Sequence, residues 1–201
     1  GANCLQSSLK AGEVRTLPLV NTIADGTAVK TPGTSIFPYL QENLDDIITI
    51  EDDELIVAFL DVLENHKLLV ENSGLLTVAA LRHLPAENKK IVSILSGGNM
   101  DIITLSSVVQ NGLIQRSRIF TVSVCLPDVP GQLNKVSKII ADAQGNVIKL
   151  EHNQFISVNR NNSVELIITM EAFGEDHKHA IIKSLQDAGY TPEEKNPRAL
   201  Y

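Results

Sequence analysis

The residues whose types and order best suit chemistry are Ser96-Gly97-Gly98-Asn99. They follow the apolar run Ile91–Leu95 and precede a helical pattern. A continuous apolar run of this length is typical of a strand covered on both faces in a parallel α/β sheet. Ligands in such sheets lie at the carboxyl ends of the strands, where glycines let them approach the backbone and the following amides can bind an anion. The sequence therefore predicts a ligand site at Ser96 and Gly97; a tight strand-to-helix connection is the alternative.

Two further segments hold candidate site residues. Asp25-Gly26 lies inside an unusually apolar loop, Thr22–Val29, and Glu71 stands where a short apolar step meets a helix start. Taken alone, the first pair is also typical of a β-turn, and Glu71 is also typical of a carboxylate beside a helix N-terminus. We interpret Gly26 and Glu71 as candidates that belong with Ser96.

The elements that must position these residues alternate between helix and strand. The apolar spacing predicts helices over residues 2–11, 34–43, 51–67, 73–84 and 101–110, and short strands over 47–50, 68–70 and 91–95. Asn111-Gly112 is a typical helix terminator, so we place a linker over residues 111–117. This order is typical of a parallel α/β layer, and residues 1–117 are expected to form an incomplete three-layer α/β unit.

The pattern changes at Arg118. Strict alternation predicts strands over residues 118–126, 146–155 and 163–173, with a hairpin tip over 159–162 and an edge strand over 191–196. Helices are expected over 132–143, with Leu133, Val136, Ile139 and Ile140 inward, and over 175–187, with Ala180, Ile181 and Leu185 inward. The order is βαββα(β), which is a ferredoxin-like arrangement. Residues 118–201 are therefore expected to fold as a separate domain.

Composition sets broad limits on function. The chain has 201 residues, 43% of them hydrophobic, and a formal net charge of −7. No basic stripe exists to neutralise phosphates, which argues against nucleic acid as a partner. No apolar run approaches the length of a membrane span, and the first residues show neither the basic region nor the apolar region of a signal peptide. Cys4 and Cys125 are too few for a metal cluster or a disulfide framework, so we interpret both as buried thiols of a cytoplasmic protein.

The three candidate segments together resemble the threonine dehydratases (threonine ammonia-lyases). The resemblance rests on Ile23-Ala24-Asp25-Gly26, Val70-Glu71-Asn72-Ser73-Gly74 and Leu95-Ser96-Gly97-Gly98-Asn99, in that order and approximate spacing, and on the stretch from Gly1 to Leu9. Residues 118–201 resemble the ACT regulatory domain that ends many of these enzymes, through the turn Asp128-Val129-Pro130-Gly131-Gln132-Leu133. The resemblance covers essentially the whole chain.

The resemblance implies a pyridoxal-phosphate lyase of the tryptophan-synthase-β fold type. Such enzymes remove water and then ammonia from threonine to leave 2-oxobutanoate. Ser96 matches the residue that hydrogen-bonds the pyridine nitrogen of the cofactor. Gly26, Glu71 and Gly97 match positions that line the cofactor ring and its neighbourhood.

The chain departs from the family in one important respect. The Schiff-base lysine and the glycine-rich phosphate loop of these enzymes lie in their upstream half, and neither motif occurs here. We therefore expect a C-terminal fragment without a catalytic residue of its own, inactive alone. Ile47, Val70, Ile91 and Ile94 are expected to contact the missing half or another copy. A stand-alone ACT module that binds a ligand, or assembles the protein, without catalysis is the alternative.

The resemblance also implies a regulatory site in the second domain. ACT domains typically bind amino acids between modules near the first strand-helix turn, here Asp128–Leu133. Gly131 would admit a ligand, Asn146 would meet its α-amino group, and Leu133 would suit a branched aliphatic side chain. A branched-chain effector and a homo-oligomer assembled through the ACT domains are thus expected.

Overall fold

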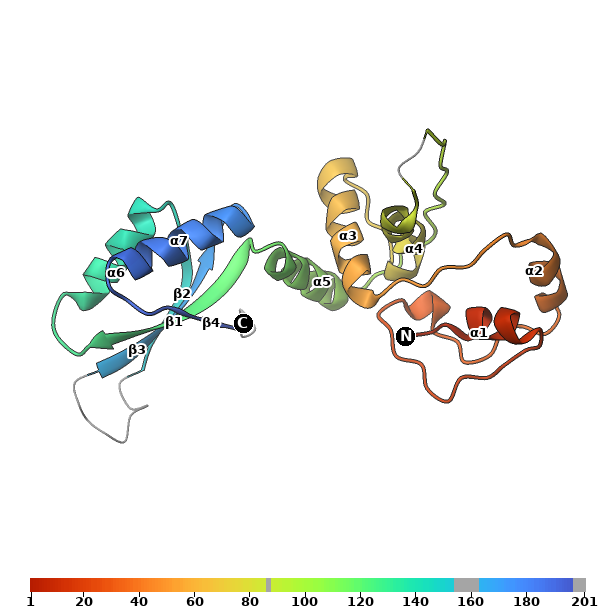
Figure 1. Ribbon diagram of the computed structural model, residues 1–201, viewed down its shortest axis with the longest axis horizontal. Helices are drawn as coiled ribbons and strands as arrows, with labels where there is room; N and C mark the ends of the chain where they lie inside the picture. The colour runs from red at the N-terminus through yellow and green to blue at the C-terminus, as the bar shows by residue number, and fades with distance from the viewer. Residues whose placement is uncertain (86–87, 154–162, 197–201) are drawn as a thin grey trace. The chain divides into compact units, whose positions relative to one another are not determined.

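The computed structural model describes residues 1–85, 88–153 and 163–196. The chain divides into two compact units, Gly1–Gly112 and Leu113–Tyr201 (Figure 1). Each unit has its own buried apolar cluster. The boundary lies a few residues before Arg118, where the sequence pattern changes.

The first unit consists of helices and connecting loops. In chain order they are α1 (Cys4–Ala11), the 3-10 turn η1 (Asp25–Thr27), α2 (Phe37–Asn43), α3 (Asp52–His66), η2 (Asn72–Leu75), α4 (Leu76–Ala79), η3 (Ala80–His83) and the beginning of α5 (Ile102–Gln115). The core is built around α3, whose buried residues pack with Val70, Leu75, Ala79 and Val108.

The start of α3 is fixed by a capping box. The backbone N–H of Glu51 donates to Glu54 Oε2 at 2.9 Å, and the Glu51 side chain accepts from the backbone N–H of Glu54. Such a box satisfies helix N–H groups that have no partner within the helix. The hydrogen bond from Glu51 and the neighbouring His83 hold the pKa of the Glu54 carboxyl below its usual value.

The strands predicted for the first unit are absent from its described residues. No β-strand forms within residues 1–85 and 88–112, so the prediction of strands over 47–50, 68–70 and 91–95 is wrong for this chain by itself. A strand requires a neighbour that completes its ladder of backbone hydrogen bonds, and these apolar segments do not pair with one another. Val70 is buried, whereas Ile91 and Ile94 are 49% and 73% exposed.

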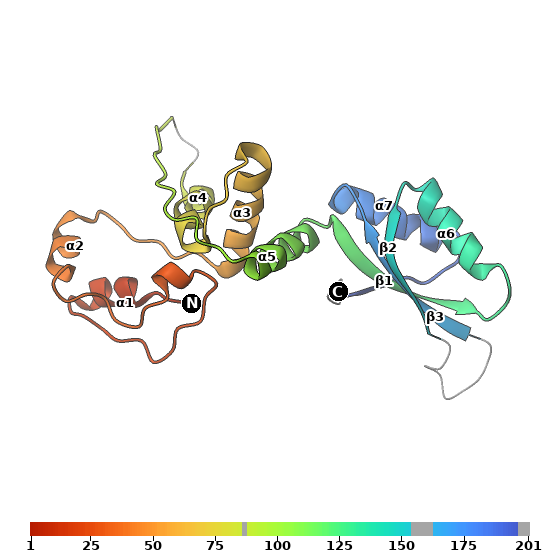
Figure 2. The ribbon, with the colours of Figure 1, turned by 180° about the vertical axis from the view of Figure 1, so that it is seen from behind.

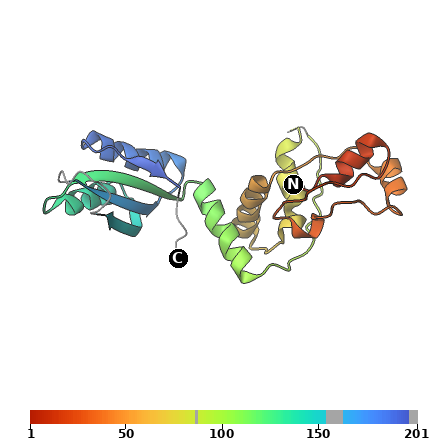
Figure 3. The same ribbon diagram turned by 90° about the horizontal axis from the view of Figure 1, so that it is seen from below.

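Helix α5 is longer than its sequence indicates. It is the long green helix of Figure 3, which runs through Asn111-Gly112 and ends at Gln115. After it, Ser117 adopts a left-handed conformation (φ 52°) and the Arg118 N–H donates to the Leu113 carbonyl. The predicted stop at Gln110 is therefore wrong. The boundary between the two units does fall within the predicted linker over 111–117, but that stretch is helical as far as Gln115. A Cβ at Gly112 would stand 2.6 Å from Leu60 Cδ1, so the glycine allows α5 to approach α3 closely rather than ending the helix.

The second unit has the βαββαβ order that the sequence predicts. Its elements are β1 (Ile119–Pro127), α6 (Gln132–Asp142), β2 (Asn146–Asn153), β3 (Ser163–Glu171), α7 (Glu175–Asp187) and β4 (Glu193–Lys195). The strands form one antiparallel sheet in the order β2-β3-β1-β4. Figure 2 shows both helices with the sheet from behind. The predicted hairpin tip over 159–162 lies outside the described residues.

One face of the sheet packs against both helices. Val122, Val124, Leu166 and Ile168 form the core with helix residues such as Ile181. Alternation along the strands sends the intervening side chains to the opposite face, which we call the open face. Cys125 lies at such an intervening position and is exposed, so the prediction that both thiols are buried holds for Cys4 and is wrong for Cys125.

Two helix positions also differ from their predictions. Leu133 is 44% exposed and Ala180 is exposed, although both were expected to face inward. On α7 the inward stripe instead contains Lys178, which stands one turn before Ile181 and two turns before Leu185 and is 9% exposed. A helix-period pattern predicts apolar residues at such positions, and this lysine is accommodated because its ammonium has carboxylate partners.

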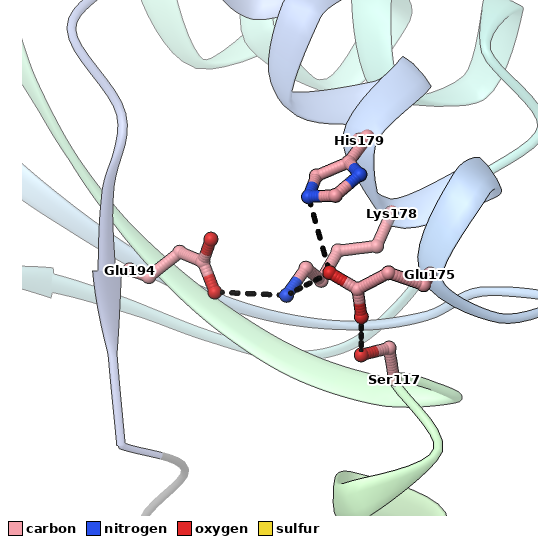
Figure 4. A network of polar contacts seen from close by, with 5 residues as sticks. All are labelled: Ser117, Glu175, Lys178, His179 and Glu194. Atoms are coloured by element: carbon pink, nitrogen blue, oxygen red, sulfur yellow. Dashed lines mark hydrogen bonds and ion pairs between the residues drawn. The ribbon is translucent and has the colours of Figure 1, made fainter.

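A polar network surrounds Lys178 (Figure 4). Its ammonium lies 3.0 Å from Glu175 Oε1 and 3.0 Å from Glu194 Oε2, so it joins α7 to β4. The Ser117 hydroxyl donates to the other oxygen of Glu175. Burial lowers the pKa of Lys178, but its bonds with Glu175 and Glu194 outweigh that effect and raise the pKa overall.

Candidate functional site

The structure brings the three candidate segments of the first unit together. The Glu71 N–H donates to the Gly97 carbonyl at 3.2 Å, which joins the second segment to the third. The Asn72 side-chain amide donates to the Ile23 carbonyl at 3.0 Å, which joins the second segment to the first. Residues far apart in sequence thereby form one local cluster, with Glu71 and Asn72 at its centre.

The backbone at Gly97 leaves no room for a side chain. Its φ is +78°, and a Cβ would stand 2.2 Å from Glu71 Cδ and 2.5 Å from both carboxylate oxygens. A left-handed φ favours glycine, and here the neighbouring carboxylate requires it as well. The two candidates Glu71 and Gly97 are thus in direct contact.

Two other glycines make similarly close approaches. A Cβ at Gly26 would stand 2.6 Å from Ser73 Oγ, and one at Gly74 would stand 1.9 Å from the Ser96 carbonyl oxygen. The Ser73 hydroxyl donates to Glu71 Oε1 at 2.7 Å. The candidate Gly26 therefore lies against a hydroxyl that is itself held by Glu71.

Helix α3 holds the first segment in place through its first residue. Asp52 accepts a hydrogen bond from Thr22 Oγ1 at 2.6 Å and another from the Ile23 N–H at 3.0 Å. The sequence predicts only that Asp52 lies at the start of a helix over 51–67, so it misses this role. The sequence did not predict a role for Ser73, Asn72 or Asp52, although the first two lie inside the motif Val70–Gly74.

Helix α4 holds the segment that leads to Ser96. Thr77 Oγ1 donates to the Ile94 carbonyl at 3.0 Å, and Ser93 Oγ donates to the Thr77 carbonyl at 3.4 Å. The Ser96 side chain itself is exposed. Among the residues that the structure describes, its hydroxyl has no hydrogen-bond partner, which leaves it available to a ligand.

A hollow of about 380 Å³ opens beside this cluster. Glu71, Ser73, Gly26 and Asn99 contribute to its lining, together with residues at the start of α5. Asn72 also lines it, and its buried Oδ1 has no hydrogen-bond partner within the described residues. Buried polar atoms without a partner are rare in native structures, so this oxygen marks a place where a further group would satisfy the site.

The second unit places the predicted regulatory residues at two different ends of its sheet. Asp128, Gly131 and Leu133 line a hollow of about 310 Å³ beyond the end of β1, together with His152. Gly131 has φ +91°, and a Cβ there would meet nothing within 4 Å, so the space beside it is open.

Asn146 does not lie next to that turn. Asn146 on β2 pairs with Glu171 on β3, and Glu171 pairs with Ile119 at the start of β1. The Asn146 side-chain amide also donates to Glu171 Oε2 at 2.8 Å. The turn follows the opposite end of β1. The expectation that Asn146 adjoins the turn is therefore wrong within one chain, because β2 runs antiparallel to β3 and brings His152, not Asn146, to that end.

Neither a membrane-spanning helix nor a metal-binding cluster is found among the residues that the structure describes. No helix among them is both long enough and apolar enough to cross a membrane. Within the same residues, no group of three or more His, Cys, Asp or Glu side chains is arranged to hold a metal ion.

Comparison with known proteins points to one class of enzyme. Residues 1–97 match the family model described as pyridoxal-phosphate dependent enzyme. These residues include Gly26, Glu71, Ser96 and Gly97. The match implies pyridoxal phosphate as the cofactor.

Several proteins that are similar to this chain are threonine ammonia-lyases or threonine deaminases. The chain is 36% identical over 185 residues to the L-threonine ammonia-lyase of Geobacter sulfurreducens, which covers 91% of this chain and 46% of that protein. It is 29% identical over 185 residues to the L-threonine ammonia-lyase of Thermotoga maritima, covering 92% and 46%. The solved structure of the processed form of threonine deaminase isoform 2 from Solanum lycopersicum is 32% identical, with a TM-score of 0.51 over 55% of this chain and 34% of that one. These relatives are enzymes. The chain spans about half the length of the curated relatives that it matches.

The described residues fit pyridoxal phosphate in two ways. The close approaches at Gly26, Gly74 and Gly97 hold the three segments against one another, and residues of all three segments line the hollow, which we call the cradle. The unpartnered Asn72 oxygen offers an acceptor in the hollow, and the exposed Ser96 hydroxyl, which does not line it, lies in the same segment as Asn99, which does. A flat aromatic ring with polar edges is the kind of ligand that such a cradle accommodates.

Proposed function

We propose that this chain supplies part of the pyridoxal-phosphate site of an enzyme that converts L-threonine to 2-oxobutanoate and ammonia. One observation carries the proposal: three separate segments meet at a single hollow, and two of them, with the beginning of the third, lie in the region that matches the cofactor's family. The substrate is taken from the relatives, which are named as threonine ammonia-lyases.

The cofactor, when bound, supplies an electron sink for the negative charge that develops on the substrate. In the proposed role the Ser96 hydroxyl hydrogen-bonds the pyridine nitrogen. A neutral hydroxyl does not keep that nitrogen protonated as a carboxylate would, so the ring withdraws electrons less strongly. This suits elimination, in which the leaving group takes up the charge. Glu71, fixed by Gly97 and Ser73, would stand beside the ring.

This chain does not contribute the covalent lysine in our proposal. Among the residues that the structure describes, no lysine lines the hollow beside Glu71. The Lys30 ammonium donates to the Pro18 carbonyl, and the Lys67 ammonium donates to the Glu64 carbonyl. A lysine that forms a covalent bond to the cofactor must point at its aldehyde. We therefore propose that another part of the parent protein supplies it.

We further propose that the second unit is an ACT-type regulatory domain. Its βαββαβ order, its separate core and the open space at Gly131 support this role. The proposed effector is a branched-chain amino acid at the Asp128–Leu133 turn, and oligomers would form through this unit. The alternative, a sensing or assembly module without catalysis, is favoured by the fact that the unit has a complete core of its own.

A fusion protein tests the proposed activity. The part of the Geobacter sulfurreducens enzyme upstream of the matched region is joined before Gly1, and 2-oxobutanoate release from L-threonine is measured with added pyridoxal phosphate. We expect turnover by the fusion and none by the 201-residue chain alone. A fusion with Gly97→Ala should lose activity, whereas a fusion with Gly12→Ala should retain it.

Two outcomes would contradict the proposal. Turnover by the chain alone would show that the missing lysine is not needed. A folded fusion that does not act on threonine, but whose melting temperature rises with isoleucine or valine, would favour the regulatory module without catalysis.

A further inference from the structure

The open face of the second unit's sheet holds a hollow that no part of the proposed function uses. It has a volume of about 280 Å³ and lies over the middle of the four strands, on the face away from α6 and α7. Its lining residues come from all four strands. The side chains that line the hollow are polar or charged, except that of Ile167.

The strand register arranges the charges of this face in two rows. Lys195, Thr121, Thr169 and Lys149 are paired in turn across β4, β1, β3 and β2, so two lysines flank two threonines. Two residues along, the next row is Glu193, Ser123, Ile167 and Glu151, so two glutamates flank a serine and an isoleucine. The rows lie about 7 Å apart along the strands. A positive row thus runs beside a negative one.

The floor of the hollow keeps one hydroxyl proton available. Thr121 Oγ1 and Thr169 Oγ1 lie 2.9 Å apart, and the residues are only 3% and 5% exposed. A hydroxyl has one proton to donate, so one threonine donates to the other and the second keeps its own proton. Neither hydroxyl has another partner among the described residues. A ligand carboxylate over this pair would accept that proton.

The charged walls can exchange their present partners for a ligand. Lys149 lies 3.1 Å from Glu151, and Lys195 lies 3.2 Å from Glu193. The side chains of both lysines are more than two-fifths exposed, and exposed ion pairs of this kind contribute little to stability. A ligand that carries both charges would replace these contacts without leaving either sign unpaired.

We propose that the open face binds a small zwitterion, namely a free α-amino acid. Its carboxylate would lie over Thr121 and Thr169 between Lys149 and Lys195, and its ammonium would face Glu151 and Glu165. The half-buried Ile167 side chain between them would contact the carbon skeleton. This site is separate from the Asp128–Leu133 turn and does not depend on the proposed enzyme activity.

Methyl NMR on the 201-residue chain tests the proposal. L-valine is compared with isovalerate, which lacks the ammonium, and with isobutylamine, which lacks the carboxylate. We expect valine at millimolar concentration to shift the Ile167 and Thr169 methyl signals saturably, with an affinity at least about tenfold higher than either analogue. The shifts should persist in Gly131→Val, which separates this site from the turn.

Matched variants locate the site. Lys195→Met and Thr169→Val should each weaken valine binding by about tenfold, whereas Lys138→Met, on α6 at the other face, should leave it unchanged. The proposal is overturned by an absence of saturable shifts in the folded chain, or by isovalerate binding as tightly as valine. Shifts that depend on protein concentration instead of ligand concentration would also overturn it, because they would indicate contact with a second copy.

Discussion

The Glu71 carboxyl group occupies the space that any side chain at Gly97 would need, since a Cβ there would stand 2.2 Å from Glu71 Cδ. We expect Gly97→Ala to lower the free energy of unfolding of the first unit by about 2–4 kcal/mol, because it combines a left-handed φ with overpacking. Gly12 is a matched control: its φ is +74°, but a Cβ there meets nothing within 4 Å.

Gly12→Ala should therefore cost only the backbone strain, about 1 kcal/mol. Urea denaturation of both variants measures the difference. Equal losses for the two substitutions would show that Glu71 moves away without cost, and that the contact does not fix the position of the carboxylate.

Ser96 and Ser93 are two serines of the same segment with different environments. Ser93 Oγ bonds the Thr77 carbonyl, whereas the Ser96 hydroxyl has no partner among the described residues. In the active fusion we expect Ser96→Ala to lower kcat by about 10- to 100-fold, because a hydrogen bond to the reacting system is lost. Ser93→Ala should leave kcat nearly unchanged. The reverse ranking would remove Ser96 from the site.

Lys178 joins α7 to β4 through Glu175 and Glu194. Its side chain is 11% exposed, but those two glutamates are 54% and 56% exposed and stay hydrated. We expect Lys178→Met, which keeps the buried stem, to cost about 1 kcal/mol of stability. Lys138→Met, at a lysine paired with Asp142 and 71% exposed, should cost no more than about 0.5 kcal/mol. Thermal unfolding compares the two, and equal costs would contradict the role assigned to Lys178.

The Glu175 carboxyl should make the second unit sensitive to acid. The Ser117 hydroxyl and then the Lys178 ammonium hold the pKa of Glu175 below its usual value. Since the folded pKa is lower than the unfolded one, the unfolded chain binds protons first as the solution is acidified. The contribution to stability is therefore complete above the unfolded pKa and is lost as pH falls through the folded pKa.

Ser117→Ala isolates the larger of these causes. It removes the hydroxyl but keeps Lys178, so we expect the pKa of Glu175 to rise toward its usual value without reaching it. An NMR titration of the Glu175 side-chain carbon in both proteins measures the shift. An unchanged pKa would contradict the hydrogen bond from Ser117.

The second unit could be predicted from sequence almost entirely, because its signals are local. Period-2 alternation and turn residues determine β1 and β3, and both are found at nearly the expected positions. The errors concern single side chains. Lys178 is inward although its type predicts a surface position, because carboxylates from Glu175 and Glu194 offset its burial.

The first unit could be predicted only in part, because an apolar run of strand composition forms a strand only where a neighbouring segment pairs with it, and none does so within residues 1–85 and 88–112. The run Ile91–Leu95 has strand composition, but it forms no ladder in this chain. The cluster at Glu71 could be predicted more fully, because most of its members lie within the three recognisable motifs. The role of Asp52 could not be predicted, because nothing in its sequence neighbourhood indicates that the first residue of a helix would bind Thr22 and Ile23.

The central claim is that this chain supplies the cradle of a pyridoxal-phosphate site but not its covalent lysine. Borohydride reduction of the fusion loaded with pyridoxal phosphate, followed by peptide mass spectrometry, tests it most directly. We expect one stoichiometrically modified lysine, in the part that precedes Gly1, and loss of that modification in the Gly97→Ala fusion but not in the Gly12→Ala fusion. Stoichiometric modification of a lysine within residues 1–201, or no stoichiometric modification at all in a folded fusion, would contradict the claim.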